Sequence, residues 1–319
     1  MTMRLRVVLL LAIVFAGSRP VDAAEPHVLQ AAQKSGTEAT LMGIHFRSPH
    51  LGWAVGTGGI ILKTTDGGRR WRPVTSGTTS QITSVFFADA QHGWVVGANG
   101  IILYSKDGGE KWHLQNSGTQ SPLYGVYFLT ASIGWAVGGA GTILSTDDGG
   151  AHWIDQPSGT NAILYGVHFL DEAHGGVSGA LGTILLTEDG GKTWRGQEIR
   201  SAGTFFDIVL TGPTDAWTVG NAGAMFQTQD GGNRWIDRTL PCARTCSRLT
   251  DLLRIRFTDD KSGWVIGEHG AIYRTTDAGF SWFEQTSKSK RSLYGLTFPD
   301  SAHGWASGEQ GTILTLAPQ

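Results

Sequence analysis

The sequence has few charged residues and almost no cysteine, and both shortages narrow the classes of protein that it can encode. Charged residues make up 16% of the 319 residues, against about 25% in an average soluble domain, and the formal net charge is −2. A chain this close to neutral is not drawn to nucleic acid by bulk charge. Two cysteines cannot cross-link a disulfide scaffold of this length. With 40% hydrophobic residues, the chain is no disordered segment either.

Long hydrophobic runs are also missing, with one short exception near the start. Two arginines precede the apolar run 7–17, and a stretch of mostly small residues follows as far as Ala23. This order is typical of a secretory signal peptide over residues 1–23, and the run is too short to span a bilayer comfortably. We expect cleavage after Ala23, a single domain over residues 24–319, no stable membrane insertion, and a periplasmic or extracellular location.

Glycine and tryptophan are abundant instead, with 46 and 12 copies, and the tryptophans mark a repeat. Six follow a glycine or alanine at spacings of 41, 41, 82, 47 and 41 residues, and halving the 82 places Gly176 in a copy that lacks the ring. The other six tryptophans each close an octet of the form S/T-x-D-x-G-x-x-W. The two series are Trp53, Trp94, Trp135, Trp217, Trp264, Trp305 and Trp71, Trp112, Trp153, Trp194, Trp235, Trp282.

Each repeat contains four short segments with the composition of β-strands. In residues 82–116 these segments are ITSVFF, GWVVG, IILYS and WHLQN, separated by the turn sequences ADAQ, ANG and KDGGE. One four-stranded sheet cannot bury both of its faces, whereas sheets stacked around an axis can. The repeat therefore predicts an all-β, seven-bladed β-propeller of four-stranded blades.

The last repeat is incomplete, which predicts how the ring closes. It begins at Tyr294 and stops after Thr312–Leu316, so its fourth strand is missing. Near the other end of the sequence, residues 35–37 (SGT) lie 41 positions before the same triplet at residues 76–78. We expect His27–Gln30 to pair beside Thr312–Leu316, so that the N-terminal strand completes blade 7 and covers an exposed sheet edge.

The octets place an aspartate beside a hydroxyl, a combination that also occurs in catalytic sites. An aspartate in a glycine-containing turn can instead accept hydrogen bonds from the turn amides. Six copies spread around a ring cannot converge on one substrate. We therefore predict a structural role for the octet aspartates and expect no catalytic residues, no metal and no cofactor; these aspartates are Asp66, Asp107, Asp148, Asp189, Asp230 and Asp277.

The octet resembles the Asp box of bacterial neuraminidase repeats, which sialidases also carry. That resemblance implies an alternative function, a glycan-binding protein or a sialidase-like glycoside hydrolase. Sialidases need an arginine cluster, a tyrosine nucleophile with an acidic partner, and an acid/base aspartate on six blades. No residue set that departs from the repeat would supply these groups here, so we expect no enzyme.

The whole chain more closely resembles the photosystem II stability/assembly factor propellers. The pattern GWAVG-x-x-G-x-IL-x-T-x-DGG-x-x-W recurs over residues 27–316. The resemblance implies a non-enzymatic scaffold, expected as a monomer, that binds another protein and assists the assembly or stability of a membrane or envelope complex. In a phototroph it implies the thylakoid lumen and a photosystem II reaction-centre precursor as the partner.

The largest departure from the repeat is an insertion between blades 5 and 6. Trp235 and Phe257 are 22 residues apart, against 16 in the complete units, and the added loop reads DRTLPCARTCSRLTD. It contains both cysteines, Cys242 and Cys246, for which we predict a local disulfide in an oxidising compartment. Free thiols, a metal site and a redox pair are the alternatives.

The same stretch is locally basic, which suggests two interpretations. In the first, the arginines of this stretch bind an acidic segment of a partner protein. In the second, they form a solvated edge and pair with neighbouring aspartates. The candidate partner-binding residues are Arg238, Arg244, Arg248, Arg254 and Arg256.

Gly176 is a further departure from the repeat, since it occupies a tryptophan position. The missing tryptophan would leave a gap or pocket in blade 4. His92, His174 and His303 recur at the position before the Gly-Trp pair or its equivalent. They lie on separate blades, so we do not expect them to share a metal.

Overall fold

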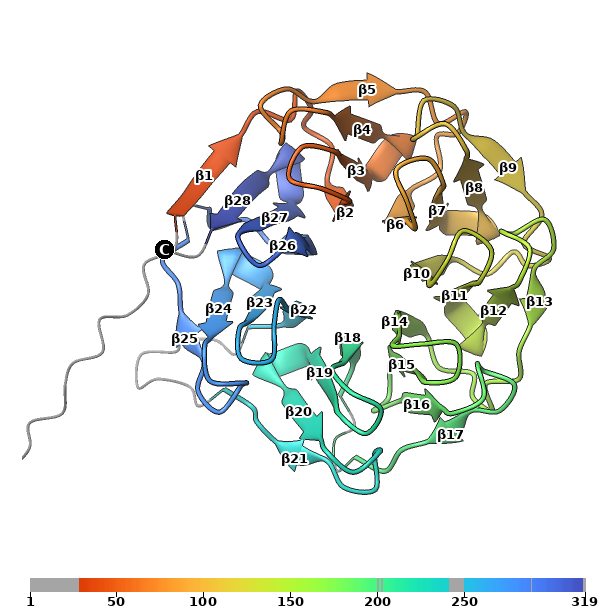
Figure 1. Cartoon of the computed structure of the whole chain (residues 1–319), viewed down its shortest axis with the longest axis vertical. Coiled ribbons are helices and arrows are strands. Elements are labelled where there is room, and N and C mark those ends of the chain that lie inside the picture. The colour runs from red at the N-terminus through yellow and green to blue at the C-terminus, as the bar shows by residue number, and fades with distance from the viewer. Residues whose placement is uncertain (1–28, 200, 202, 241–249, 288, 318–319) are drawn as a thin grey trace, which may run out of the picture.

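In a computed structural model of the chain, seven four-stranded antiparallel sheets are arranged around a central axis (Figure 1). The structure describes residues 29–199, 201, 203–240, 250–287 and 289–317. Within these residues, each sheet is one repeat, with its first strand nearest the axis and its fourth at the rim. The seven-bladed fold predicted from the repeat is confirmed.

The first strand of every blade is innermost and the second follows it outward. The innermost strands are β2 (Leu41–Phe46), β6 (Ile82–Phe87), β10 (Leu123–Phe128), β14 (Leu164–Phe169), β18 (Phe205–Leu210), β22 (Leu252–Phe257) and β26 (Leu293–Asp300). The second strands carry the Gly-Trp pairs or their equivalents: β3 (Gly52–Gly56), β7 (Gly93–Gly97), β11 (Gly134–Gly138), β15 (Gly175–Gly179), β19 (Ala216–Gly220), β23 (Gly263–Gly267) and β27 (His303–Gly308).

The two outer strands of each blade are shorter, and the outermost spans only two or three residues in blades 1 to 6. The third strands are β4 (Ile61–Thr64), β8 (Ile102–Ser105), β12 (Ile143–Thr146), β16 (Ile184–Thr187), β20 (Met225–Thr228), β24 (Ile272–Thr275) and β28 (Ile313–Ala317). The rim strands are β5 (Arg72–Val74), β9 (His113–Gln115), β13 (Ile154–Asp155), β17 (Arg195–Gly196), β21 (Ile236–Asp237), β25 (Phe283–Glu284) and β1 (Leu29–Gln33).

Short 3₁₀ turns join the second strand to the third in six of the blades that the structure describes. Their middle residues have left-handed backbone angles, whether or not they are glycine. The turns are η1 (Thr57–Gly59), η2 (Ala98–Gly100), η3 (Gly139–Gly141), η4 (Asn221–Gly223), η5 (Glu268–Gly270) and η6 (Glu309–Gly311).

The N-terminal strand closes the ring. β1 pairs antiparallel with β28 from Leu29 opposite Ala317 to Gln33 opposite Ile313. The predicted closure is confirmed, although the described strand extends to Gln33, beyond the expected end at Gln30, and the expected first residues His27 and Val28 lie outside the described residues. Gln33 fixes this position, because its Nε2 donates to the Gly67 carbonyl at 2.8 Å and its Oε1 accepts from Trp71 Nε1 at 3.1 Å.

Neighbouring blades are joined by stacked aromatic rings. Trp53 of blade 1 lies flat on Phe87 of blade 2, with ring centroids 3.4 Å apart, and the octet residue Trp112 meets the same phenylalanine edge-on. Flat stacks also join blades 2 to 3, 3 to 4 and 7 to 1. These large buried rings fill the space between twisted sheets, which explains why two tryptophan positions recur through the chain.

The interface between blades 4 and 5 uses a different solution. Gly176 stands where the stacking tryptophan would be, and Leu210 replaces the phenylalanine that such a ring would contact. A Cβ added at Gly176 would lie 2.9 Å from Ile208 and Leu210 and 3.2 Å from Leu186. Aliphatic side chains from both blades therefore occupy the space beside Gly176, and a cavity of only about 20 Å³, lined by Gly175, Leu186 and Leu210 among others, lies next to it.

The aromatic stack should carry a measurable part of the stability. Replacing Phe128 by alanine removes the ring between Trp94 and Trp153, and we expect the free energy of unfolding to fall by about 3–5 kcal/mol. Leu114→Ala is the control, because Leu114 is 73% exposed and should change stability by less than about 0.5 kcal/mol. Urea unfolding measures both, and similar values for the two variants would contradict the role of the stack.

Candidate functional site

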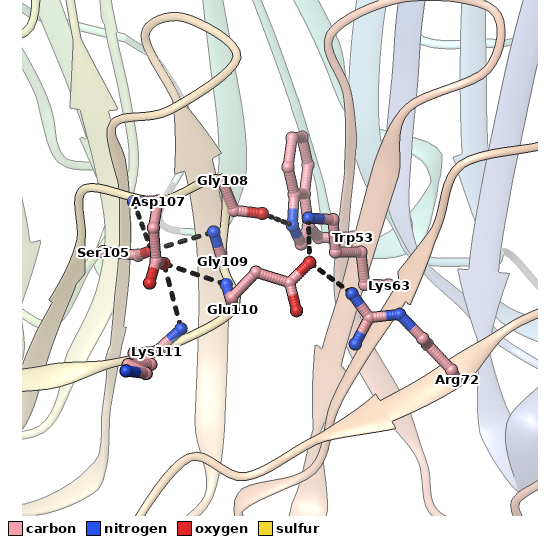
Figure 2. A network of polar contacts seen from close by, with 9 residues as sticks. All are labelled: Trp53, Lys63, Arg72, Ser105, Asp107, Gly108, Gly109, Glu110 and Lys111. Carbon is pink, nitrogen blue, oxygen red and sulfur yellow. Dashed lines mark hydrogen bonds and ion pairs between the residues drawn. The ribbon is translucent and has the colours of Figure 1, made fainter.

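Each octet forms a self-contained hydrogen-bonded turn between the third and fourth strands. In blade 2, the Ser105 hydroxyl donates to Asp107 Oδ1 at 2.9 Å and accepts from Gly109 N at 2.8 Å. Asp107 Oδ1 also accepts from the amides of Glu110 and Lys111, both at 3.0 Å (Figure 2). The equivalent aspartates in blades 1, 3, 4, 5 and 6 accept in the same way from an amide four residues ahead.

The octet turn is also an attachment point for the preceding blade. Trp53 of blade 1 donates its Nε1 proton to the Gly108 carbonyl at 3.0 Å, as Figure 2 shows, and the same bond recurs between the next two pairs of blades. Gly109 has φ +81°, and a Cβ there would lie 2.5 Å from that Nε1. Only glycine therefore permits both the turn and the tryptophan contact.

An ion-pair network reinforces the junction of blades 1 and 2. The buried Lys63 donates to Glu110 Oε1 at 2.7 Å, and Arg72 contacts the same oxygen (Figure 2). These contacts lower the pKa of Glu110, with the Lys63 hydrogen bond as the largest cause. The octets thus hold blades together at separate places around the ring, and no two of their aspartates meet.

Amide hydrogen bonds lower the pKa of the octet aspartates. In Asp148 and Asp189 the pKa falls to about 2, chiefly because the amides of His152 and Thr193 donate to the charged form. The carboxylates are therefore ionised at neutral pH and remain bound within their own turns. Groups held in this way are poorly suited to exchange protons with a substrate.

The central channel holds another departure from the repeat. The third residue of the innermost strand is glycine or serine in five blades, because the next blade passes close by: a Cβ at Gly295 would lie 2.9 Å from Ile44 N. Blades 5 and 6 carry Asp207 and Arg254 at this position. The Asp207 carboxylate accepts a hydrogen bond from Ile255 N of the next inner strand at 3.0 Å. This bond accommodates the larger side chain where the two strands approach each other.

Two arginines of β22 line a cavity of about 200 Å³ in the channel, called here the channel cavity. Arg256 donates to Asp207 Oδ2 at 2.5 Å, and Arg254 donates to the Leu253 carbonyl at 2.7 Å. Burial lowers the pKa of Arg254. Inner-strand residues from blades 1 to 4 and 7 form the rest of the lining, including His45, Phe86, Tyr127 and His168.

The two channel histidines are neutral at physiological pH. Burial lowers the pKa of His45 and of His168 to about 3, and the charge of Arg256 contributes in the same direction to both. His168 Nδ1 accepts a hydrogen bond from Leu210 N at 3.3 Å, which a protonated nitrogen could not do. The positive charge of the channel cavity therefore comes from its arginines.

The five arginines predicted to bind a partner do not lie on one surface. Arg254 and Arg256 line the channel, whereas Arg238 follows the rim strand β21. The Arg238 guanidinium lies 5.3 Å from the centroid of the Phe280 ring, and its Nε donates to Gln227 Oε1. Arg244, Arg248 and both cysteines of the predicted disulfide, Cys242 and Cys246, lie outside the described residues.

Sequence reasoning missed Asp207 and the channel histidines. Asp207 is 49 residues before its partner Arg256, so nothing in the local sequence connects them. Alignment of the repeats carries a signal, because a charged side chain stands where most blades have glycine.

Among the described residues, no group of three or more histidine, cysteine, aspartate or glutamate side chains is placed to hold a metal ion. His92, His174 and His303 instead each contact an aspartate three residues earlier in their own turn. In the same part of the chain, no helix has the length and apolar character needed to cross a membrane.

The architecture defines the class of the protein, a seven-bladed β-propeller built from one repeated four-stranded unit. The profile of the family described as photosynthesis system II assembly factor YCF48 matches residues 27–116, 153–235 and 197–283. The chain belongs to this family, which confirms the resemblance drawn from the repeat. A search of curated proteins gave no match.

Solved structures with the same architecture include two of YCF48. YCF48 from Cyanidioschyzon merolae is 22% identical, with a TM-score of 0.74 over 90% of this chain and 98% of that one. YCF48 bound to a D1 peptide is 19% identical, with a TM-score of 0.74 over 92% and 95%. An inactive virginiamycin B lyase from Staphylococcus aureus with quinupristin is 13% identical, with a TM-score of 0.79 over 92% and 100%. At these identities the likeness shows the fold alone.

The low pKa of the octet aspartates predicts how stability depends on pH. Asp148 has a folded pKa of about 2 against an ordinary value of 3.8, so its stabilising effect is complete above about pH 5 and is lost as the pH falls towards 2. We expect Asp148→Asn to lower the free energy of unfolding at pH 7, and the difference from wild type to shrink at pH 3. Urea unfolding at both values checks this, and a difference independent of pH would contradict it.

Proposed function

We propose that the protein is an exported, non-catalytic assembly or stability factor that binds a subunit of a membrane or envelope protein complex. Membership of the YCF48 family supports a protein-binding propeller, and one structure with this fold, YCF48, holds a D1 peptide. In a phototrophic source the partner would be a photosystem II reaction-centre precursor in the thylakoid lumen. Elsewhere it would be a periplasmic or extracellular segment of another complex.

The observation that carries this proposal is an exposed patch at the rim of blades 5 and 6, called here the rim patch and formed by Arg238, Phe280 and Phe283. Phe280 is 72% exposed and Phe283 is 41% exposed. The guanidinium of Arg238 lies over the Phe280 ring. Arginine and aromatic side chains are enriched among the residues that dominate protein interfaces.

The rim patch stands beside the irregular part of the repeat. The Phe280 position belongs to the octet turn, and the other octets place Arg69, Glu110, Ala151, Lys192 or Asn233 there. Among the six octets, all of which the structure describes, only the one in the blade after the six-residue insertion has a large exposed aromatic side chain at this position. Arg238 supplies a positive charge beside exposed rings, so an acidic, partly apolar segment of the partner would match the rim patch. In sequence, the insertion adds Arg244 and Arg248.

Partner capture tests the rim patch. We expect the pair Arg238→Glu and Phe280→Ser to leave the fold intact and to reduce co-purification of the partner from the host envelope at least about tenfold, because it removes the aromatic anchor and reverses a charge. Adding Arg244→Glu and Arg248→Glu should abolish capture.

The matched control is the pair Arg69→Glu and Leu114→Ser, which makes the same kinds of change on the exposed surface of blades 1 and 2. We expect this control to capture the partner normally. Undiminished capture by the rim-patch variants, with circular dichroism unchanged, would exclude the rim patch as the binding surface.

Export predicts a defined mature N-terminus. If residues 1–23 form a cleaved signal peptide, the protein recovered from the host envelope begins at Ala24. N-terminal sequencing or intact mass of that material checks the boundary. A protein recovered with Met1 and the apolar run intact would contradict export by cleavage.

A further inference from the structure

The channel cavity carries an uncompensated positive charge. It is lined by Arg254 and Arg256, and its lining includes no aspartate or glutamate. Asp207 reaches Arg256 from blade 5 and neutralises one of the two guanidinium groups. Among the described residues, no carboxylate lies within ion-pair distance of Arg254, whose hydrogen bond goes to the Leu253 carbonyl. Because arginine stays charged and the channel histidines are neutral, one positive charge remains.

Arg254 is partly buried, and Asp207, the carboxylate whose charge acts on it, is already bound to Arg256. The two guanidinium groups therefore keep a net positive charge that a further anion would compensate. Arg254 stands at the third position of its inner strand, where most other blades have glycine or serine. The close approach of neighbouring inner strands favours glycine at this position. The guanidinium therefore occupies a place that the ring geometry alone would leave to a small residue. A planar guanidinium presents paired N–H donors that match a carboxylate.

The rest of the lining combines aromatic and aliphatic side chains with small polar residues such as Thr83, Ser84 and Thr297. Rings from four successive blades form an arc in which His45 contacts Phe86, Phe86 contacts Tyr127, and Tyr127 contacts His168, with centroids 4.8, 4.9 and 5.0 Å apart. Such a surface receives a planar apolar group better than a strongly hydrated ion. It disfavours a multiply charged inorganic anion, which would bring more negative charge than Arg254 can balance.

The size of the channel cavity sets the size of the ligand. Its volume is about 200 Å³, and a cavity of roughly 150 Å³ in another protein holds a benzene molecule. The space thus accommodates one planar ring together with a carboxylate.

We propose that the channel cavity binds a small organic monocarboxylate with a planar apolar body. The carboxylate accepts hydrogen bonds from Arg254 and Arg256, and the apolar body lies against Phe86 and Tyr127. The channel cavity is separate from the rim patch. A failure of ligand binding in the channel would therefore not contradict the proposed binding of a protein partner.

Calorimetric titration of the purified full chain tests the ligand class with three probes. Benzoate should bind, while benzamide, which has the same shape without the charge, should bind at least about tenfold more weakly. Inorganic phosphate should give no binding in the same concentration range. Absence of benzoate binding up to millimolar concentrations, equal binding of benzamide, or preferential binding of phosphate would overturn the proposal.

Two channel variants test the location. Arg254→Met leaves the Asp207–Arg256 pair in place and should weaken benzoate binding about tenfold or more. Met42→Trp alters no charge but fills part of the cavity from a position outside the close approach of the inner strands, and it should weaken benzoate binding to the same extent. Arg195→Met, on the exposed rim strand β17, is the control and should bind as wild type does. Full affinity in either folded channel variant would overturn the proposal.

Discussion

The stack of a tryptophan on the phenylalanine of the next blade is the contact on which the ring depends. A single blade exposes two apolar faces and gains little by folding alone. The tryptophan fills the space between two blades and also donates its N–H to the octet turn of its neighbour. Each tryptophan needs both the phenylalanine ring and the octet carbonyl of the next blade at fixed positions. This double requirement explains why the repeat length stays at 41 residues along most of the chain.

The interfaces without a flat stack lie together on one side of the ring. Blades 4 and 5 meet through Gly176 and Leu210, and the aromatic pairs of blades 5 to 6 and 6 to 7 are tilted or displaced, with centroids 5.7 Å apart. The insertion, the rim patch and the charged inner strands β18 and β22 all belong to this side. Flat aromatic stacks thus join the regular blades on one side of the ring. The irregular blades on the other side carry the side chains of the rim patch and of the channel cavity, for which we propose ligand binding.

Much of the fold could be predicted because the repeat encodes it locally. Four strands per unit, seven units and closure by the N-terminal strand all follow from the period and from the turn residues. The compensation at Gly176 could not be predicted in this way, because Leu186 and Leu210 come from different strands and blades. The final register of β1 depends on Gln33, whose contacts Gly67 and Trp71 are more than thirty residues away.

The site was harder to predict because the ring, and not the chain, brings its residues together. Arg254 and Arg256 follow the insertion closely in sequence. The innermost strand of blade 6 nevertheless begins at Leu252, so both arginines belong to that strand and line the channel. His45, Phe86, Tyr127 and His168 each come from a different blade. Only comparison of equivalent positions across repeats marks Asp207 and Arg254 as exceptional.

The closing strand also determines the order in which the molecule can be completed. Of the strands that the structure describes, β1 comes first in the chain and its partner β28 comes last, so Leu29 and Ala317 pair across a separation of 288 residues. Six blades can form from contacts within one or two repeats, whereas the seventh must wait for both parts of the chain. Pairing of β1 with β28 therefore closes a long loop of the chain, and a β28 edge left without β1 would be open to pairing with another chain.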